Sequence, residues 1–246
     1  MSNEPEAHFE EAVTDWADPF AHPVYFGRRD PDSTKFEVAS GTGGLLRLDG
    51  KFLGVTCQHV MKEYRAAKRE GRADFFYFGD AAIDPEAAIV DESERLDLIV
   101  FDLSHVAART PLLKEGNFYD PRRWPPADVD ESDVLAFVGF PGEWREQEGA
   151  LDLYFYKINY GAASVESVSE DRICSRLALD EVTYFVRHRD AFQSAGGLSG
   201  APVFAWRRGV LLTAELVGFV YEYQEAFDLL FIRRASCIQA SGKLEK

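Results

Sequence analysis

The sequence predicts an all-β protein with two β-rich halves. Short runs of apolar, aromatic and β-branched residues begin near residue 23 and recur at intervals of about ten residues, a pattern typical of β-barrels and β-sandwiches. Residues 117–133 interrupt these runs with three prolines and a cluster of acids, which indicates a linker. The chain has 246 residues, enough for one or two domains.

The first half is expected to contain five strands and one helical stretch. Its expected strands are residues 23–27, 43–48, 52–56, 75–78 and 96–103. Residues 58–72 form the clearest helical stretch, because they are good helix formers and Gly71 is suited to end them. The basic side chains of this stretch are interpreted as a solvated helix face and not as a nucleic-acid site.

The second half resumes the strand pattern after the linker. Its expected strands are residues 134–140, 153–160, 182–186, 202–205, 211–223 and 229–232. We therefore expect four segments: an acidic arm at residues 1–22, an N-terminal β-domain at 23–120, a proline-rich linker at 121–133 and a C-terminal β-domain at 134–240.

Composition excludes several classes of partner. The net charge of −15 argues against nucleic acid and against an anionic membrane surface. The apolar runs are all shorter than the roughly 18 residues of a membrane span. The N-terminus lacks the basic start and apolar segment of a secretory signal, so a cytoplasmic location is expected. Three cysteines without a C-x-x-C pair are expected to be buried free thiols.

No cofactor is expected from the motifs. The glycines near residues 41–51 have the wrong spacing for a phosphate-binding loop or a dinucleotide-binding fingerprint. The five histidines form no H-x-x-x-H pair, so no metal site is expected either.

The first candidate for chemistry is Ser199, in the segment GGLSGAP at residues 196–202. A nucleophilic serine needs a sharp turn and backbone N–H groups that point at an oxyanion, and glycines supply the required dihedrals. The same glycines also fit a plain turn that enters a strand. Because Ala201 stands where a G-x-S-x-G elbow has glycine, an α/β-hydrolase is disfavoured.

Two further residues are suited to activate Ser199. His59 lies where a predicted strand ends and the helix begins, so one ring nitrogen can be fixed while the other faces a nucleophile; a capping or partly buried histidine is the alternative. Asp97 lies at the start of an apolar strand, where a partly buried carboxylate needs a partner such as an imidazole. Asp102, five residues on, is expected on the opposite strand face.

The order His59, Asp97, Ser199, with the first two residues in the first half and the third in the second, is the order of the chymotrypsin group. Further segments show shared patterns: GTGGLL at 41–46, VTCQHV at 55–60, LDLIV at 96–100, VGFPG at 138–142, GLSGAP at 197–202 and LVGFV at 216–220. On these residues the sequence resembles the trypsin-like (chymotrypsin-fold) serine peptidases, especially bacterial domains without disulfides, over about residues 23–238.

The resemblance implies two six-stranded antiparallel β-barrels with a short helix after the histidine and an active site between the barrels. It implies His59 as general base and acid, Asp97 as its orienting partner and Ser199 as nucleophile. Gly197 and Ser199 would donate the oxyanion-hole N–H groups. The function implied is an intracellular serine endopeptidase acting on a protein or peptide.

The sequence also departs from the family pattern. Leu198 replaces the acid that receives a new N-terminus on activation, so regulation is expected through loop order or through a partner or activator. By resemblance, the substrate pocket is expected at Gln193, with Tyr221 and Glu222 on the substrate strand. Gln193 is uncharged, while Glu222 would favour basic side chains. The alternative function is a catalytically silent peptidase-fold protein that binds proteins or peptides.

Overall fold

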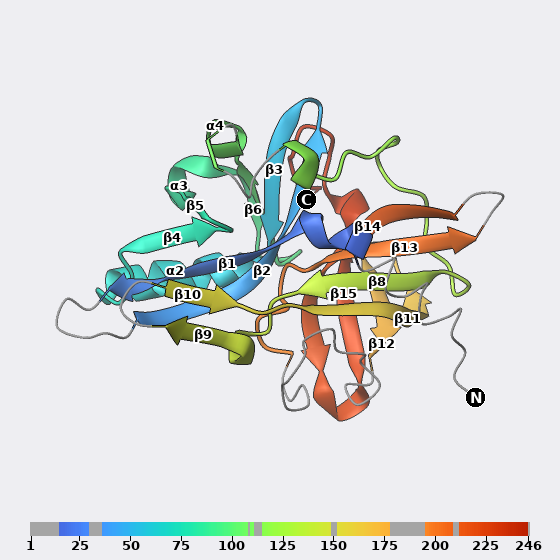
Figure 1. The fold of residues 1–246 in the computed structure, drawn as a ribbon. Helices are drawn as coiled ribbons and strands as arrows, with labels where there is room; N and C mark the ends of the chain where they lie inside the picture. Colours follow the sequence, from blue (N-terminus) through green and yellow to red (C-terminus); the bar gives the residue numbers. More distant parts are fainter. Residues whose placement is uncertain are drawn as a thin grey trace.

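The computed structural model describes residues 15–29, 36–107, 109–110, 115–148, 152–177, 195–208 and 212–245. Figure 1 shows two β-rich parts side by side, the first coloured blue to green and the second yellow-green to red. Within the described residues, no helix has both the length and the apolar character needed to cross a membrane. The prediction of an all-β protein is confirmed.

The first part is a seven-stranded antiparallel sheet with the strand order β5-β4-β1-β2-β3-β7-β6. Its strands are β1 (Ala21–Arg29), β2 (Phe36–Leu48), β3 (Lys51–Thr56), β4 (Phe75–Phe78), β5 (Ala81–Ala82), β6 (Ile89–Ser93) and β7 (Leu98–Asp102). Its described residues include the helices α2 (Gln58–Arg69), α3 (Pro85–Ala88) and α4 (Ser104–Ala107). Short 3-10 helices, η1 (Asp18–Phe20) and η2 (Glu115–Asn117), flank it in sequence.

The expectation of a closed six-stranded barrel in this half is not met by the described residues. The sheet has seven strands, and β5 and β6 stand at its two ends. Strand β5 contains only two residues and pairs with β4, which leaves few backbone groups to reach β6. At the other end, the pairing of β6 with β7 shifts register between Ile89 and Asp91.

The second part is a closed barrel of six strands in the order β11-β12-β15-β14-β13-β8, as predicted for this half. Its strands are β8 (Val134–Gly139), β11 (Ile158–Val168), β12 (Arg172–Arg176), β13 (Pro202–Arg208), β14 (Leu212–Gln224) and β15 (Leu229–Arg234). Among its described residues are the 3-10 helices η3 (Gly142–Trp144), η5 (Glu225–Phe227) and η6 (Ala235–Cys237). The predicted strand at residues 182–186 lies outside the described residues.

A separate hairpin, β9 (Arg145–Glu148) with β10 (Asp152–Phe155), reaches from the barrel to the first sheet. In Figure 1 it runs alongside β1, and the ring of Phe155 lies 4.7 Å from the ring of Tyr25. The hairpin therefore packs against the first part although its residues follow the linker.

The predicted helix is present but ends three residues early, at Arg69. Gly71 adopts a φ of 70°, which a residue without a side chain reaches at little cost, so the chain turns away there. The linker at residues 121–133 contains no helix or strand.

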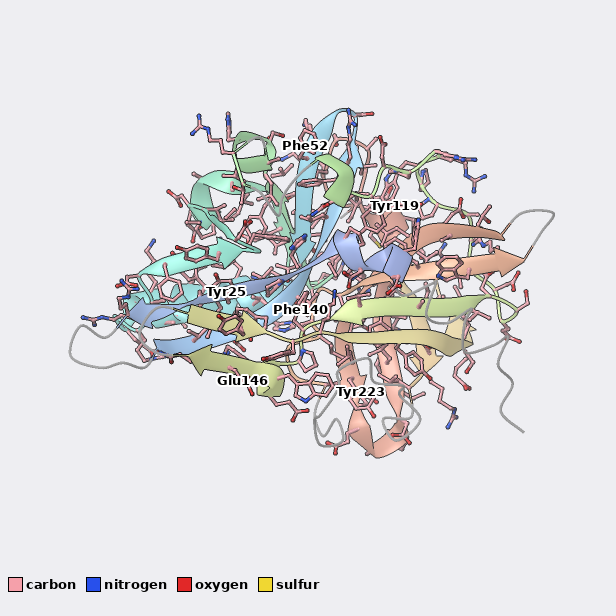
Figure 2. All side chains as sticks on the ribbon, viewed as in Figure 1. Tyr25, Phe52, Tyr119, Phe140, Glu146 and Tyr223 are labelled. Atoms are coloured by element: carbon pink, nitrogen blue, oxygen red, sulfur yellow. The ribbon has the colours of Figure 1, made fainter. Side chains whose placement is uncertain are left out.

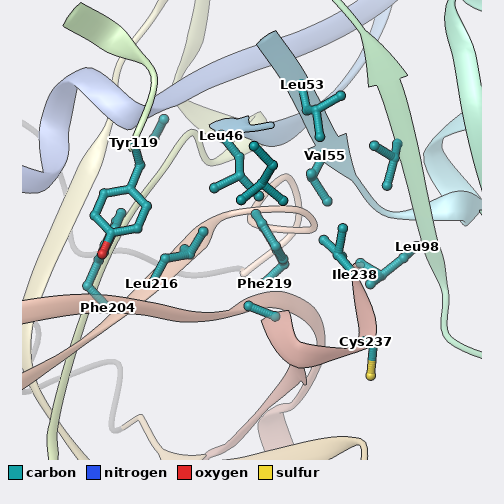
Figure 3. Close-up of a cluster of buried hydrophobic side chains, with 14 of the residues drawn as sticks. Leu46, Leu53, Val55, Leu98, Tyr119, Phe204, Leu216, Phe219, Cys237 and Ile238 are labelled. Atoms are coloured by element: carbon teal, nitrogen blue, oxygen red, sulfur yellow. The ribbon is translucent and has the colours of Figure 1, made fainter. Parts of the chain in front are cut away.

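One buried apolar cluster joins the two parts. Figure 3 shows Leu46, Leu53, Val55 and Leu98 from the first sheet against Leu216, Phe219 and Ile238 from the second part. Phe219 is fully buried, and a Cβ added to Gly44 would lie 2.6 Å from its ring. Burial of apolar surface favours any arrangement that hides it, whereas close packing of these side chains favours one arrangement. The cluster therefore fixes the position of the two parts relative to each other. It therefore also fixes the cleft between them.

Candidate active site

Asp97 holds the histidine at the start of α2. The N-cap residue Cys57 provides no side-chain cap, and the Oδ1 atom of Asp97 accepts a 2.9 Å hydrogen bond from the backbone N–H of His59. The other carboxylate oxygen, Oδ2, lies 2.7 Å from Nδ1 of the His59 ring. One carboxylate thus satisfies a free N–H of the first helical turn and orients the imidazole.

This arrangement sets the protonation state of the ring. A carboxylate can only accept, so Nδ1 carries the proton and Nε2 keeps its lone pair in the neutral ring. The hydrogen bond to Asp97 raises the pKa of His59, burial opposes this, and the charges of Asp97 and Glu63 add to the rise. The imidazolium form is therefore stabilised, as a general base requires once it has taken up a proton.

The sequence placed Asp97 at the start of a strand, and the structure places it in the turn just before β7. Its φ is 51°, a left-handed conformation that aspartate tolerates better than most residues. Its backbone N–H donates to the carbonyl of Glu94 at 3.3 Å. The tight turn aims the carboxylate at α2 and not along the strand.

The loop that carries Ser199 is built around two left-handed glycines. Gly197 has a φ of 94° and Gly200 a φ of 91°. A Cβ on Gly197 would lie 2.4 Å from the nitrogen of Gly142, and a Cβ on Gly200 would lie 2.1 Å from the oxygen of Thr42. Both positions therefore exclude any side chain, for conformational and steric reasons.

Thr42, on β2, ties this loop to the first sheet. Its backbone N–H donates to the carbonyl of Ser199 at 2.9 Å, and its hydroxyl donates to the carbonyl of Gly197 at 2.7 Å. The same hydroxyl accepts from the N–H of Phe140 at 2.9 Å. Sequence reasoning noted the surrounding GTG segment but did not assign this role to Thr42. The signal was a small hydroxyl residue between glycines, ahead of the histidine.

The candidate oxyanion hole is free. Within the part of the chain that the structure describes, neither the N–H of Gly197 nor the N–H of Ser199 donates a hydrogen bond. The carbonyl of Gly196, one residue earlier, is instead held by the N–H of Gly142 at 2.8 Å. Two backbone donors are thus available for a developing negative charge.

His59 and Ser199 line the same pocket, which has a volume of about 310 Å³. The other lining residues are Ala195, Gly196, Tyr221, Glu222, Tyr223 and Glu225. The structure therefore brings together His59, Ser199 and the predicted pocket residues Tyr221 and Glu222. Gln193 lies outside the described residues. Tyr223 and Glu225 were not predicted as pocket residues: Tyr223 is the last residue of the expected strand at 211–223, and Glu225 lies beyond it.

The pocket wall formed by β14 and η5 is acidic and aromatic. Glu222 is exposed and accepts a 2.9 Å hydrogen bond from Nε2 of Gln224. The Tyr221 ring lies 4.5 Å from the guanidinium carbon of Arg233, and burial raises the pKa of its phenol. The pocket therefore combines carboxylate charge with aromatic surface.

Leu198, beside the serine, is almost fully buried at 1% exposure. The Leu198 side chain packs directly against Gly139: a Cβ added to Gly139 would lie 2.6 Å from the Cδ2 atom of Leu198. Apolar packing inside the barrel therefore anchors the loop at the residue where the family's activation switch has an acid.

Cys57, His59 and Asp97 place three atoms of the kind that bind metals within 4.8 Å of one another. The Cys57 thiol is fully buried and donates to the carbonyl of Val220 at 3.2 Å. Burial and the charge of Asp97 raise its pKa, which disfavours the thiolate that a metal needs. Since Nδ1 of His59 already bonds to Asp97, these residues fit a hydrogen-bonded network better than a metal site. All three cysteines are buried and unpaired.

The chain matches a known protein family. A family model described as a trypsin-like peptidase domain matches residues 41–212. No curated protein sequence matches the chain. Similar solved structures include the thermostable serine protease AL20 from an extremophilic microorganism, with 12% identity over 89% of this chain and 92% of that one and a TM-score of 0.48.

Two viral structures are also similar. One comes from work on the coupled folding and binding of the disordered Sesbania mosaic virus VPg protein, with 13% identity over 88% of this chain and 92% of that one and a TM-score of 0.41. The other is the tobacco vein mottling virus protease, with 9% identity over 92% of this chain and 79% of that one and a TM-score of 0.43. By the family model, which covers most of its length, the chain belongs to the trypsin-like peptidase domain family.

Proposed function

We propose that the protein is a serine endopeptidase that cleaves peptide bonds through an acyl-enzyme on Ser199. The observation that carries this proposal is the 2.7 Å contact between Nδ1 of His59 and Oδ2 of Asp97 in a ring that lines the same pocket as Ser199. It leaves Nε2 of His59 as the acceptor on the pocket side, as a general base requires.

Each proposed residue has one step. The Ser199 hydroxyl attacks the carbonyl carbon of the peptide, and its proton passes to Nε2 of His59. The N–H groups of Gly197 and Ser199 stabilise the oxyanion of the tetrahedral intermediate. His59 then gives the proton to the leaving amine as the C–N bond breaks. Water repeats the sequence on the acyl-enzyme and regenerates the serine, while Asp97 keeps the ring in the required tautomer throughout.

Labelling by a fluorophosphonate probe tests this proposal, because the probe phosphonylates only an activated serine. We expect the full chain to be labelled and the Ser199→Ala variant not to be. Cleavage of a peptide library, read by mass spectrometry, identifies the side chains around the bond. An unlabelled wild-type protein across the pH range of folding contradicts the proposal.

One observation favours the second candidate function, a peptidase-fold protein that binds peptides without cleaving them. Within the described residues, the hydroxyl of Ser199 forms no hydrogen bond with the His59 ring. In unliganded enzymes this contact is often long and tightens only when substrate binds. Peptide affinity without labelling would support the binding module.

Location and regulation remain part of the proposal. The buried, unpaired cysteines support a reducing, cytoplasmic compartment. Because Leu198 is packed into the barrel, control of activity is proposed to act through a partner or through loop order and not through a new N-terminus.

A further inference from the structure

Arg145 is an exception among the described arginines that are buried or half-buried. The other described arginines that are buried or half-buried each pair with a carboxylate: Arg47 with Asp120, Arg65 with Glu86 and Glu92, Arg207 with Asp133 and Glu215, Arg233 with Asp171, and Arg234 with Asp128. Arg145 is half-buried and has no carboxylate partner among the described side chains. This is unexpected in a chain with 42 acidic and 27 basic residues.

Arg145 lies beside the loop of the proposed nucleophile. It is the first residue of β9 and follows η3. Its Nη1 atom donates to the hydroxyl of Ser40 at 3.2 Å. Gly142 lies between Ser40 and the serine loop: a Cβ added to it would lie 3.7 Å from the Ser40 hydroxyl and 3.7 Å from the carbonyl of Gly196.

Gly196 stands between two regions of opposite charge. It lines the pocket with Glu222 and Glu225, and its carbonyl accepts from Gly142 on the side of Arg145. Figure 2 labels Glu146, the residue that follows Arg145 on β9, and Tyr223, which lines the pocket from β14. We therefore expect a peptide bound at Ser199 to lie between the carboxylates of the pocket and the guanidinium of Arg145.

Half-burial of Arg145 without a carboxylate partner costs hydration, which a bound anion would offset. A buried charge without a partner loses hydration and gains little in return, and burial lowers the pKa of Arg145 accordingly. A guanidinium has five N–H donors in a planar fork, and Ser40 uses one edge of it. The remaining donors match the two oxygens of a carboxylate.

We infer that Arg145, held in place by Ser40, is a subsite that binds an acidic side chain of the peptide substrate. The acidic residue lies across the scissile bond from the side chain that enters the pocket of Glu222 and Glu225. This inference rests on the proposed function for its substrate class, but it is a statement about binding and can be tested without turnover.

The test uses the full chain with Ser199→Ala, which binds peptide without cleaving it. The immobilised protein is incubated with a blocked peptide library in which each position carries Glu or Gln, and mass spectrometry gives the Glu-to-Gln ratio of retained peptides. We expect enrichment of Glu by roughly tenfold at one position only, weakening as salt rises. Adding Arg145→Gln should abolish that enrichment. Arg122→Gln, at an exposed arginine of another pocket, is the matched control and should leave it unchanged.

Two further measurements separate the outcomes. Thermal unfolding of the Arg145→Gln variant shows whether it folds, and Arg145→Lys keeps the charge but loses the fork, so it should retain part of the enrichment. Three results would overturn the inference: peptides that are retained without Glu enrichment, Glu enrichment that survives Arg145→Gln, and no retained peptide at all. Fluorophosphonate labelling of the wild-type chain, which keeps Ser199, tests the proposed function separately. Glu selection without labelling contradicts the peptidase and leaves this subsite intact.

Discussion

The hydroxyl of Thr42 donates a 2.7 Å hydrogen bond to the carbonyl of Gly197 and accepts one from the N–H of Phe140. Thr42 lies on the first sheet, whereas the other two residues belong to the second part. A single fully buried side chain thus sets the position of the loop whose N–H groups form the candidate oxyanion hole. The hydrogen bonds of the Thr42 hydroxyl should therefore contribute both to the stability of the fold and to the reactivity of Ser199.

Thr42→Val keeps the volume and removes the hydroxyl. The carbonyl of Gly197 and the N–H of Phe140 then lose their partner, which should lower the free energy of unfolding by about 1–3 kcal/mol. The rate of fluorophosphonate labelling should fall by roughly tenfold or more, because an oxyanion donor is misplaced. Denaturant unfolding and labelling kinetics measure the two effects. Thr213→Val, at an exposed site on β14, should change neither.

Asp97→Asn tests the orienting role directly. Asparagine keeps an oxygen for the backbone N–H of His59 but presents an amide group to Nδ1 of the ring. The ring then adopts the tautomer protonated at Nε2, which cannot accept the serine proton. The labelling rate should fall by about 10⁴-fold, with little change in stability at a pH above the folded pKa of His59, since the helix cap survives. An unchanged rate would assign the orienting role to another acid.

The pH dependence follows from the raised pKa of His59. The base must be neutral, so the labelling rate should rise with pH through the folded pKa, which lies above the ordinary 6.5. The stability contributed by the charged pair is fully present below the unfolded pKa and is lost as pH rises through the folded one. In Asp97→Asn the stability gain at low pH should disappear. A wild-type rate that falls over this interval would contradict the assignment.

The sequence allowed a better prediction of the residues of the candidate site than of the sheet in the first half, where a closed barrel was expected. His59, Asp97 and Ser199 could be proposed from sequence because each needs a local feature that is visible there: a strand-to-helix junction, an acid before an apolar strand and a glycine-rich turn. Thr42 and Arg145 could not, because their roles depend on partners that are distant in sequence, at residues 197, 140 and 40. The two-residue β5 was equally invisible, because a strand that short has no alternating pattern.

Gly200→Ala should be far more damaging than a change at another left-handed glycine. A Cβ there would lie 2.1 Å from the oxygen of Thr42 and 2.5 Å from the hydroxyl of Thr56, so the loop must move. Gly50 has a φ of 77°, but a Cβ added to it would have no atom within 4 Å, so Gly50→Ala isolates the cost of the dihedral, about 1–2 kcal/mol. Thermal unfolding and labelling of both variants give the comparison. Equal losses would show that the loop relaxes freely.

Glu222 and Glu225 are expected to favour a basic substrate side chain in the pocket. Both line it, and neither has a cationic partner among the described residues. Because Glu222 and Glu225 are exposed, screening keeps the effect modest. Glu222→Gln together with Glu225→Gln should lower kcat/KM for a lysine peptide by roughly threefold to tenfold and leave a neutral counterpart unchanged. Glu131→Gln, at an exposed acid outside the pocket, is the control. An equal loss for both peptides would show that the two acids shape the pocket and do not select charge.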